Sequence, residues 1–194
     1  MSQGRIRLAV LTSSGPESRT GPAVAEWFVE QARKFGGFDI DVVSLPEANL
    51  PVLVTRPPSA EAAERLAGIS PRLAAADAFV VITAEYNHAY PAVLKSAIDW
   101  HVDQWHAKPV AFVCYGGRSA GLRAVEQLRL VFSELHAVTL RDSVSFANVW
   151  DQFDDEGRPK DPEGIALAAK NMLNQLVWWA QSLREAREKR PFAA

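Results

Sequence analysis

Short apolar runs rich in β-branched residues recur along this chain, and segments with helical spacing lie between them. The apolar runs predict five strands, over residues 5–11, 38–45, 78–83, 108–114 and 137–146. The helical patterns cover residues 22–35, 60–76, 92–104, 122–135 and 162–190. Strands that alternate with helices in this way need right-handed parallel crossovers. We therefore predict an α/β fold, a doubly wound parallel sheet with helices on both faces.

Two segments interrupt this regular pattern. Residues 46–58 are rich in proline and have no periodicity, so we expect a long surface loop there. The helix over 60–76 contains Pro71, where we expect an interruption.

The length of 194 residues fits one domain, which we expect to span residues 1–194. A net charge of −2 without a basic run argues against a nucleic-acid partner. The first residues, MSQGRIRLAVLTSSG, have too short an apolar run for a signal peptide, and nothing approaches the roughly 20 apolar residues of a membrane span. The single cysteine, Cys114, allows no intrachain disulfide. We expect a cytoplasmic protein with no membrane partner.

Ligands of open parallel sheets bind beyond the carboxyl ends of the strands, so the loops after the first, third and fourth strands are the candidate site. The first of these loops offers the hydroxyls of Ser13 and Thr20 and the guanidinium of Arg19 at a helix start. Such a set suits one phosphate group, and ordinary helix capping explains it equally well. Because the chain has neither GxGxxG nor GxxxxGK[ST], the phosphate would be that of a mononucleotide.

The other two loops carry groups that suit a planar heterocycle. The third-strand loop has aromatic, amide and imidazole side chains in the segment Glu85, Tyr86, Asn87 and His88. An exposed turn would have the same composition. The fourth-strand loop, Tyr115-Gly116-Gly117, allows a close approach to backbone, although a plain tight turn fits it too.

These loops resemble one known family. EYNHAYPAVLKSAIDW at residues 85–100 is similar to the signature PEYN-x-x-x-P-x-x-LKNAIDW of the NADPH-dependent FMN reductase family. Ser13 with RTGPAVA at 19–25 resembles the family's phosphate loop, and YGG at 115–117 followed by GLRA at 121–124 agrees as well. The first loop is one residue longer than the usual pattern and has Gly15 where many members have arginine. Phosphate geometry and the choice between NADPH and NADH therefore stay open.

The resemblance implies a flavodoxin-like, five-stranded sheet of order 2-1-3-4-5 that binds flavin mononucleotide (FMN). Ser13, Arg19 and Thr20 would hold the phosphate, and Glu85, Tyr86, Asn87 and His88 would run along ribityl chain and ring. Tyr115, Gly116 and Gly117 would present backbone groups to the pyrimidine edge. Hydride would pass from NADPH or NADH to FMN and then, in a ping-pong cycle, to an acceptor such as a flavin, quinone, azo compound or metal oxyanion. No catalytic side chain is expected, because the flavin supplies the chemistry.

The family also implies a homodimer or homotetramer in which a neighbouring subunit helps to wall the flavin site. Asp99 and Trp100 would lie near that interface, although a core role suits Trp100 as well. Trp27, Trp105 and Trp150 would point to interfaces if they lie on the surface.

Two alternatives to a reductase remain. Gly117 to Gly121 fits GxSxG, which would make Ser119 the nucleophile of a hydrolase, yet no histidine follows in the order that such a triad needs. An FMN-binding electron carrier or regulatory module would use the same fold. His101 and His106 do not share a helix face, so no metal site is expected, and Cys114 is expected to be a core residue.

Overall fold

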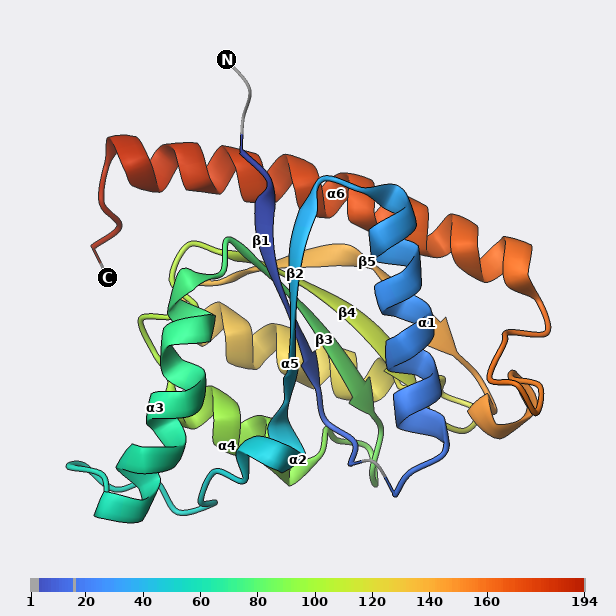
Figure 1. The fold of residues 1–194 in the computed structure, drawn as a ribbon, viewed down its shortest axis with the longest axis horizontal. Coiled ribbons are helices and arrows are strands. Elements are labelled where there is room, and N and C mark those ends of the chain that lie inside the picture. Colours follow the sequence, from blue (N-terminus) through green and yellow to red (C-terminus); the bar gives the residue numbers. More distant parts are fainter. Residues whose placement is uncertain (1–3, 16, 194) are drawn as a thin grey trace.

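The computed structural model describes residues 4–15 and 17–193, and it shows a five-stranded sheet between two layers of helices (Figure 1). The strands are β1 (Ile6–Thr12), β2 (Phe38–Ser44), β3 (Ala78–Ala84), β4 (Pro109–Tyr115) and β5 (Val138–Phe146). Their order is β2-β1-β3-β4-β5, and every neighbouring pair is parallel. The predicted fold class and strand order are therefore confirmed.

The helices divide between the two faces of the sheet. They are α1 (Thr20–Phe35), α2 (Leu45–Ala48), α3 (Ala60–Ala75), α4 (Ala92–Trp100), α5 (Leu122–Glu134) and α6 (Pro162–Lys189), with a 3₁₀ turn, η1 (Val149–Asp151). Because side chains alternate along a strand, β3 sends Val80 to the core under α1 and α6. It sends Phe79 and Val81 to the second core, under α3, α4 and α5. All residues of β3 and β4 are buried, which explains why both read as unbroken apolar runs.

Three local predictions need correction. The first residues of the loop expected over 46–58 belong to α2, which starts at Leu45, where the Ser44 hydroxyl caps it by accepting the Glu47 N–H at 3.4 Å. Helix α3 runs through Pro71 without interruption, and its buried residues Ile69 and Leu73 hold both sides of the proline against the sheet.

The third correction concerns the helix expected over 92–104, which ends at Trp100. His101 adopts an extended backbone. Its Nδ1–H donates to Ala97 O at 2.7 Å, and its Nε2 accepts from the Ser70 hydroxyl at 2.9 Å. The buried indole of Trp105 then donates to His101 O at 2.8 Å. These tertiary contacts replace the continuation of the helix that the apolar spacing indicated.

The tryptophans also separate into two groups. Trp27 and Trp105 lie in the core, so they do not mark interfaces, whereas Trp150 is 65% exposed. Cys114 is buried, as expected for a core residue. Within the described residues, no helix combines the length and the apolarity that crossing a membrane requires.

Candidate functional site

The three candidate loops leave the carboxyl ends of β1, β3 and β4, which are neighbours in the sheet. The structure therefore brings the predicted site residues to one edge, although they lie about 100 positions apart in the chain.

Ser13, in the first loop, is buried and hydrogen-bonded within the protein. Its N–H and its hydroxyl both donate to Ile82 O, at 3.2 and 3.1 Å, so the Ser13 hydroxyl ties the loop to β3. The hydroxyl of Ser18 accepts the Gly21 N–H at 3.4 Å at the start of α1, where Arg19 makes no side-chain cap. Helix capping thus comes from Ser18, and the exposed Arg19 is left for another role. Pro16 lies outside the described residues.

The first and fourth loops meet at the start of α1. The Ser14 hydroxyl is hydrogen-bonded to the hydroxyl of Tyr115, whose pKa is raised by burial. A Cβ on Gly21 would lie 2.6 Å from Ser14 Oγ and 2.7 Å from the Tyr115 hydroxyl, so only glycine fits there. Ser14 could not be singled out from the sequence, because this contact spans 101 positions.

The third-strand loop is a tight turn whose two central residues have a left-handed backbone. Tyr86 N–H donates to Ala89 O at 2.8 Å and Ala89 N–H returns to Tyr86 O at 3.0 Å. Asn87 has φ 49° and His88 has φ 71°, as in a type I′ turn. The side chains of Tyr86, Asn87 and His88 are consequently exposed at the edge of the sheet, and Gln127 holds the turn by donating to His88 O at 2.6 Å.

The left-handed backbone of His88 is strained, and glycine at this position would not be strained. We expect His88→Gly to raise the free energy of unfolding by about 0.5 to 1 kcal/mol, because a positive φ is unfavourable for a residue with a Cβ. Asn87→Gly is the control and should change stability less, since asparagine tolerates this conformation better. Urea unfolding of both variants measures the effect. A loss of stability in His88→Gly would contradict it.

The Glu85 carboxylate points back into the protein, toward the fourth loop. It is 7% exposed and accepts hydrogen bonds from the Ser119 hydroxyl at 2.7 Å and the Arg123 N–H at 3.1 Å, while the Arg123 guanidinium lies at 3.3 Å. Burial raises the pKa of Glu85, but the bonds from Ser119 and Arg123 outweigh it and hold the pKa below its ordinary value. Glu85 is therefore ionised, and it holds the third loop against the start of α5.

This contact also bears on the hydrolase alternative. The Ser119 hydroxyl donates to an ionised carboxylate. Within residues 4–15 and 17–193 no histidine is hydrogen-bonded to Ser119, so the base that a serine nucleophile needs is missing from this geometry.

The backbone of the fourth loop is mostly occupied by the segment after β5. Gly116 N–H donates to Phe146 O at 3.2 Å, and Gly116 O and Gly117 O accept the N–H groups of Val149 and Asn148 at 3.1 and 3.0 Å. In the described part of the chain, the Gly117 N–H has no acceptor. Of the backbone donors expected in this turn, Gly117 N–H is the one left to face a ligand.

Trp150 is a further candidate for the site, whereas the sequence suggested only an interface role for it. Its ring lies 3.6 Å from the position of a Cβ on Gly117. It also lines a cavity of about 330 Å³ with Arg19, Thr20, Ala23, Val149, Phe153, Asp154, Asp155 and Gly157. Trp150 therefore lies between the first loop and the fourth. Its position just after the fifth strand was the available signal, because that strand ends at the same edge of the sheet.

The comparisons with known proteins agree with this arrangement. The family model described as NADPH-dependent FMN reductase matches residues 6–151. The NAD(P)H-dependent FMN reductase C4B3.06c of Schizosaccharomyces pombe is 32% identical over 123 residues, which cover 59% of this chain and 60% of that protein. For the NAD(P)H-dependent FMN reductase PA1204 of Pseudomonas aeruginosa, identity is 33% over 58% of this chain and 64% of that protein. The chain thus spans less than two thirds of the length of these relatives.

Solved structures share the fold. The flavoenzyme FerB of Paracoccus denitrificans, an NAD(P)H:(acceptor) oxidoreductase, has a TM-score of 0.69 at 22% identity, covering 91% of this chain and 98% of its own. An oxidoreductase of Corynebacterium diphtheriae has a TM-score of 0.70 at 18% identity, covering 93% and 99%. At these identities the likeness concerns the fold alone.

Proposed function

Because the chain belongs to the NADPH-dependent FMN reductase family, we propose that it binds FMN and transfers hydride from NADPH or NADH, through the flavin, to an acceptor. The observation that carries this proposal is the meeting of the loops after β1, β3 and β4, which leave open polar groups at one edge of the sheet. Arg19 stands exposed at the start of α1, and Gly117 N–H has no acceptor in the described residues. The Arg19 guanidinium is suited to bind an anionic group, and the Gly117 N–H is suited to donate to an acceptor at the edge of a ring.

Different residues would contact different parts of FMN. Arg19 and Thr20 would hold the phosphate at the helix start, and Ser13, whose hydroxyl donates to Ile82 O, would keep the loop in place behind them. Tyr86, Asn87 and His88 would line the ribityl chain and the ring, and the Gly117 N–H would donate to the pyrimidine edge. When bound, FMN supplies the hydride chemistry. Tyr115, Gly116 and Glu85 position these groups through the bonds described above, with Glu85 and Tyr115 less available to a ligand than the sequence indicated.

The proposal extends to the acceptor and the assembly. The acceptor would be a flavin, a quinone, an azo compound or a metal oxyanion, reduced after release of oxidised pyridine nucleotide in a ping-pong cycle. The chain would act in the cytoplasm as one FMN-binding domain over residues 1–194, in a homodimer or homotetramer. A quinone and an azo compound are supported by the names of two relatives, an NADPH:quinone oxidoreductase of Arabidopsis thaliana and an FMN-dependent NADPH-azoreductase of Staphylococcus haemolyticus.

The visible absorbance of the protein with FMN, before and after anaerobic addition of NADPH or NADH, tests this function. A protein-bound flavin band that bleaches supports the reductase, and the faster donor gives the preference. A bound flavin that stays oxidised would favour the electron carrier or regulatory module. Without flavin binding the proposal fails.

Arg19→Met tests the phosphate contact. We expect FMN to bind about tenfold to a hundredfold more weakly, because a hydrogen bond to a charged group is worth about 1.5 to 3 kcal/mol. Riboflavin, which has no phosphate, should bind both proteins equally. Arg33→Met, at the other end of α1, is the control and should leave both affinities unchanged. Fluorescence titrations with the two flavins measure the constants, and an equal loss for both would show that Arg19 does not contact the phosphate.

A further inference from the structure

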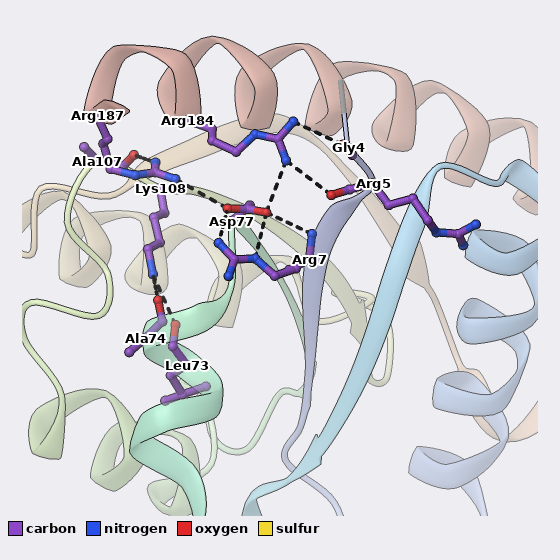
Figure 2. Close-up of polar contacts among 10 residues, drawn as sticks. All are labelled: Gly4, Arg5, Arg7, Leu73, Ala74, Asp77, Ala107, Lys108, Arg184 and Arg187. Atoms are coloured by element: carbon purple, nitrogen blue, oxygen red, sulfur yellow. Dashed lines mark hydrogen bonds and ion pairs between the residues drawn. The ribbon is translucent and has the colours of Figure 1, made fainter. Parts of the chain in front are cut away.

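Three arginine side chains contact one buried carboxylate at the opposite end of the sheet, where the strands begin, and Lys108 lies nearby with its ammonium directed at the end of α3 (Figure 2). Asp77, just before β3, is 2% exposed. Arg7 comes from β1, Lys108 precedes β4, and Arg184 and Arg187 come from α6.

Asp77 is shared by the three arginines. Arg7 Nε and Nη2 donate to its two oxygens at 3.2 and 3.0 Å, and Arg7 N–H donates at 3.0 Å. Arg184 Nη1 lies at 3.4 Å and Arg187 Nη2 at 3.9 Å. One negative charge therefore faces three guanidinium groups and the nearby ammonium of Lys108.

The other donors of the cluster bind backbone carbonyls, which are neutral. Lys108 Nζ donates to Leu73 O at 3.2 Å and Ala74 O at 2.9 Å, at the end of α3. Arg187 Nη1 donates to Ala107 O. These bonds leave one hydrogen of the Lys108 ammonium and further hydrogens of the Arg187 guanidinium for another acceptor, and the helix end contributes only about half a negative charge. The cluster keeps an excess of positive charge.

Burial is the main cause of a lowered pKa in both Lys108 and Arg187, and neighbouring cations add to it. The pKa of Lys108 is lowered to about 8, mainly by burial and then by the charge of Arg187, with Asp77 opposing and Arg7 adding to the decrease. The pKa of Arg187 is also lowered, by burial first, and the charges of Arg184 and Arg7 add to this against Asp77 and Glu188. A negative charge placed nearby would stabilise both cations.

A cavity of about 590 Å³ lies beside these two residues. It is lined by Ala74, Asp103, Gln104, His106, Lys108, Arg187 and Phe192. The Asp103 side chain is 90% exposed to solvent, and His106 packs edge-on against Phe192 at 5.6 Å between ring centroids. We propose that this cavity binds a small dianionic oxyanion, of the size and charge of inorganic phosphate, through Arg187 and Lys108, with the Gln104 amide as a neutral donor.

The experiment titrates inorganic phosphate into the FMN-saturated protein by calorimetry, with chloride keeping the ionic strength constant. Saturation with FMN fills the proposed phosphate position at Arg19. We expect saturable binding and, at pH 8, uptake of protons, because the anion raises the pKa of Lys108 from about 8. Repeating the titration in buffers of different ionisation enthalpy measures this uptake. Heat that does not saturate, or binding without proton uptake, would overturn the proposal.

Two variants locate the site. Gln104→Glu keeps the side-chain oxygen that accepts the Val102 N–H at 3.1 Å, so the loop should fold unchanged, while its charge should weaken phosphate binding at least about tenfold. Arg187→Gln should abolish binding. Arg72→Gln, which breaks the surface pair with Asp41, is the matched control and should bind as the unmodified protein does. Equal binding by Gln104→Glu and the control would show that the anion sits elsewhere.

Discussion

Asp77→Asn lowers the free energy of unfolding by about 3 kcal/mol, because it leaves the cationic cluster of Arg7, Lys108, Arg184 and Arg187 without its carboxylate. Removing one partner of a buried charge pair typically costs about 3 to 5 kcal/mol. We expect the lower end, since the Arg7 side chain is 59% exposed and water screens part of its charge. Urea unfolding measures this change in free energy as a shift of the urea concentration at the midpoint, with an unchanged slope of free energy against urea concentration.

Asp39→Asn is the matched control for this prediction. It removes a carboxylate that pairs with Arg5 on the surface, where both side chains are at least 60% exposed. Such a pair contributes less than about 1 kcal/mol. Equal losses from the two substitutions would mean that Asp77 acts as an ordinary surface carboxylate.

The pH dependence of stability distinguishes the charge of Asp77 from its shape. Burial raises the pKa of Asp77, but the hydrogen bonds from Arg7 and the charges of Arg7 and Arg184 lower it below the ordinary value of 3.8. A carboxyl group with a lowered pKa in the folded state stabilises the protein above its unfolded pKa, and this stabilisation is lost as pH falls through the folded pKa. The difference between the unmodified protein and Asp77→Asn should therefore shrink as the pH falls below about 4.

The sheet was predictable because its signal is local. β1, β3 and β4 are each mostly apolar over seven residues, and β3 and β4 show the clearest runs because both are buried on two faces. The ends of the helices were harder to predict from the sequence. The end of α4 depends on bonds from His101 to Ala97 and to Ser70, and the second of these joins positions 31 apart.

The candidate site was predictable as a set of loops but not as a set of side-chain directions. A motif places Glu85 at the edge of the sheet, whereas its direction depends on Ser119, 34 positions later. The cluster at Asp77 could not be predicted either, because its contacts also join distant positions: the contact between Asp77 and Arg184 spans 107 positions. Single charged residues next to strands look like ordinary solvated ends until the fold brings them together.

Gly121→Ala should lower the free energy of unfolding by roughly 3 kcal/mol and weaken FMN binding, because Gly121 closes the fourth loop against the end of β4. Its φ is 84°, and a Cβ would lie 2.6 Å from Tyr115 N and 3.0 Å from Tyr115 O. The left-handed backbone costs about 1 kcal/mol for alanine. The clash adds about 1 to 3 kcal/mol, since backbone atoms, unlike a flexible side chain, cannot rotate away.

Gly157→Ala separates these two contributions. Gly157 has φ 75° and no atom within 4 Å of its added Cβ, so alanine there carries the backbone cost without the clash. We expect a loss of about 1 kcal/mol for this control. If both variants lose the same amount in urea unfolding, the close approach to Tyr115 contributes nothing. A larger loss for Gly121→Ala means that this close approach holds in place the turn that carries the Gly117 N–H. In that case the Gly121→Ala protein should also bind FMN more weakly than the unmodified protein.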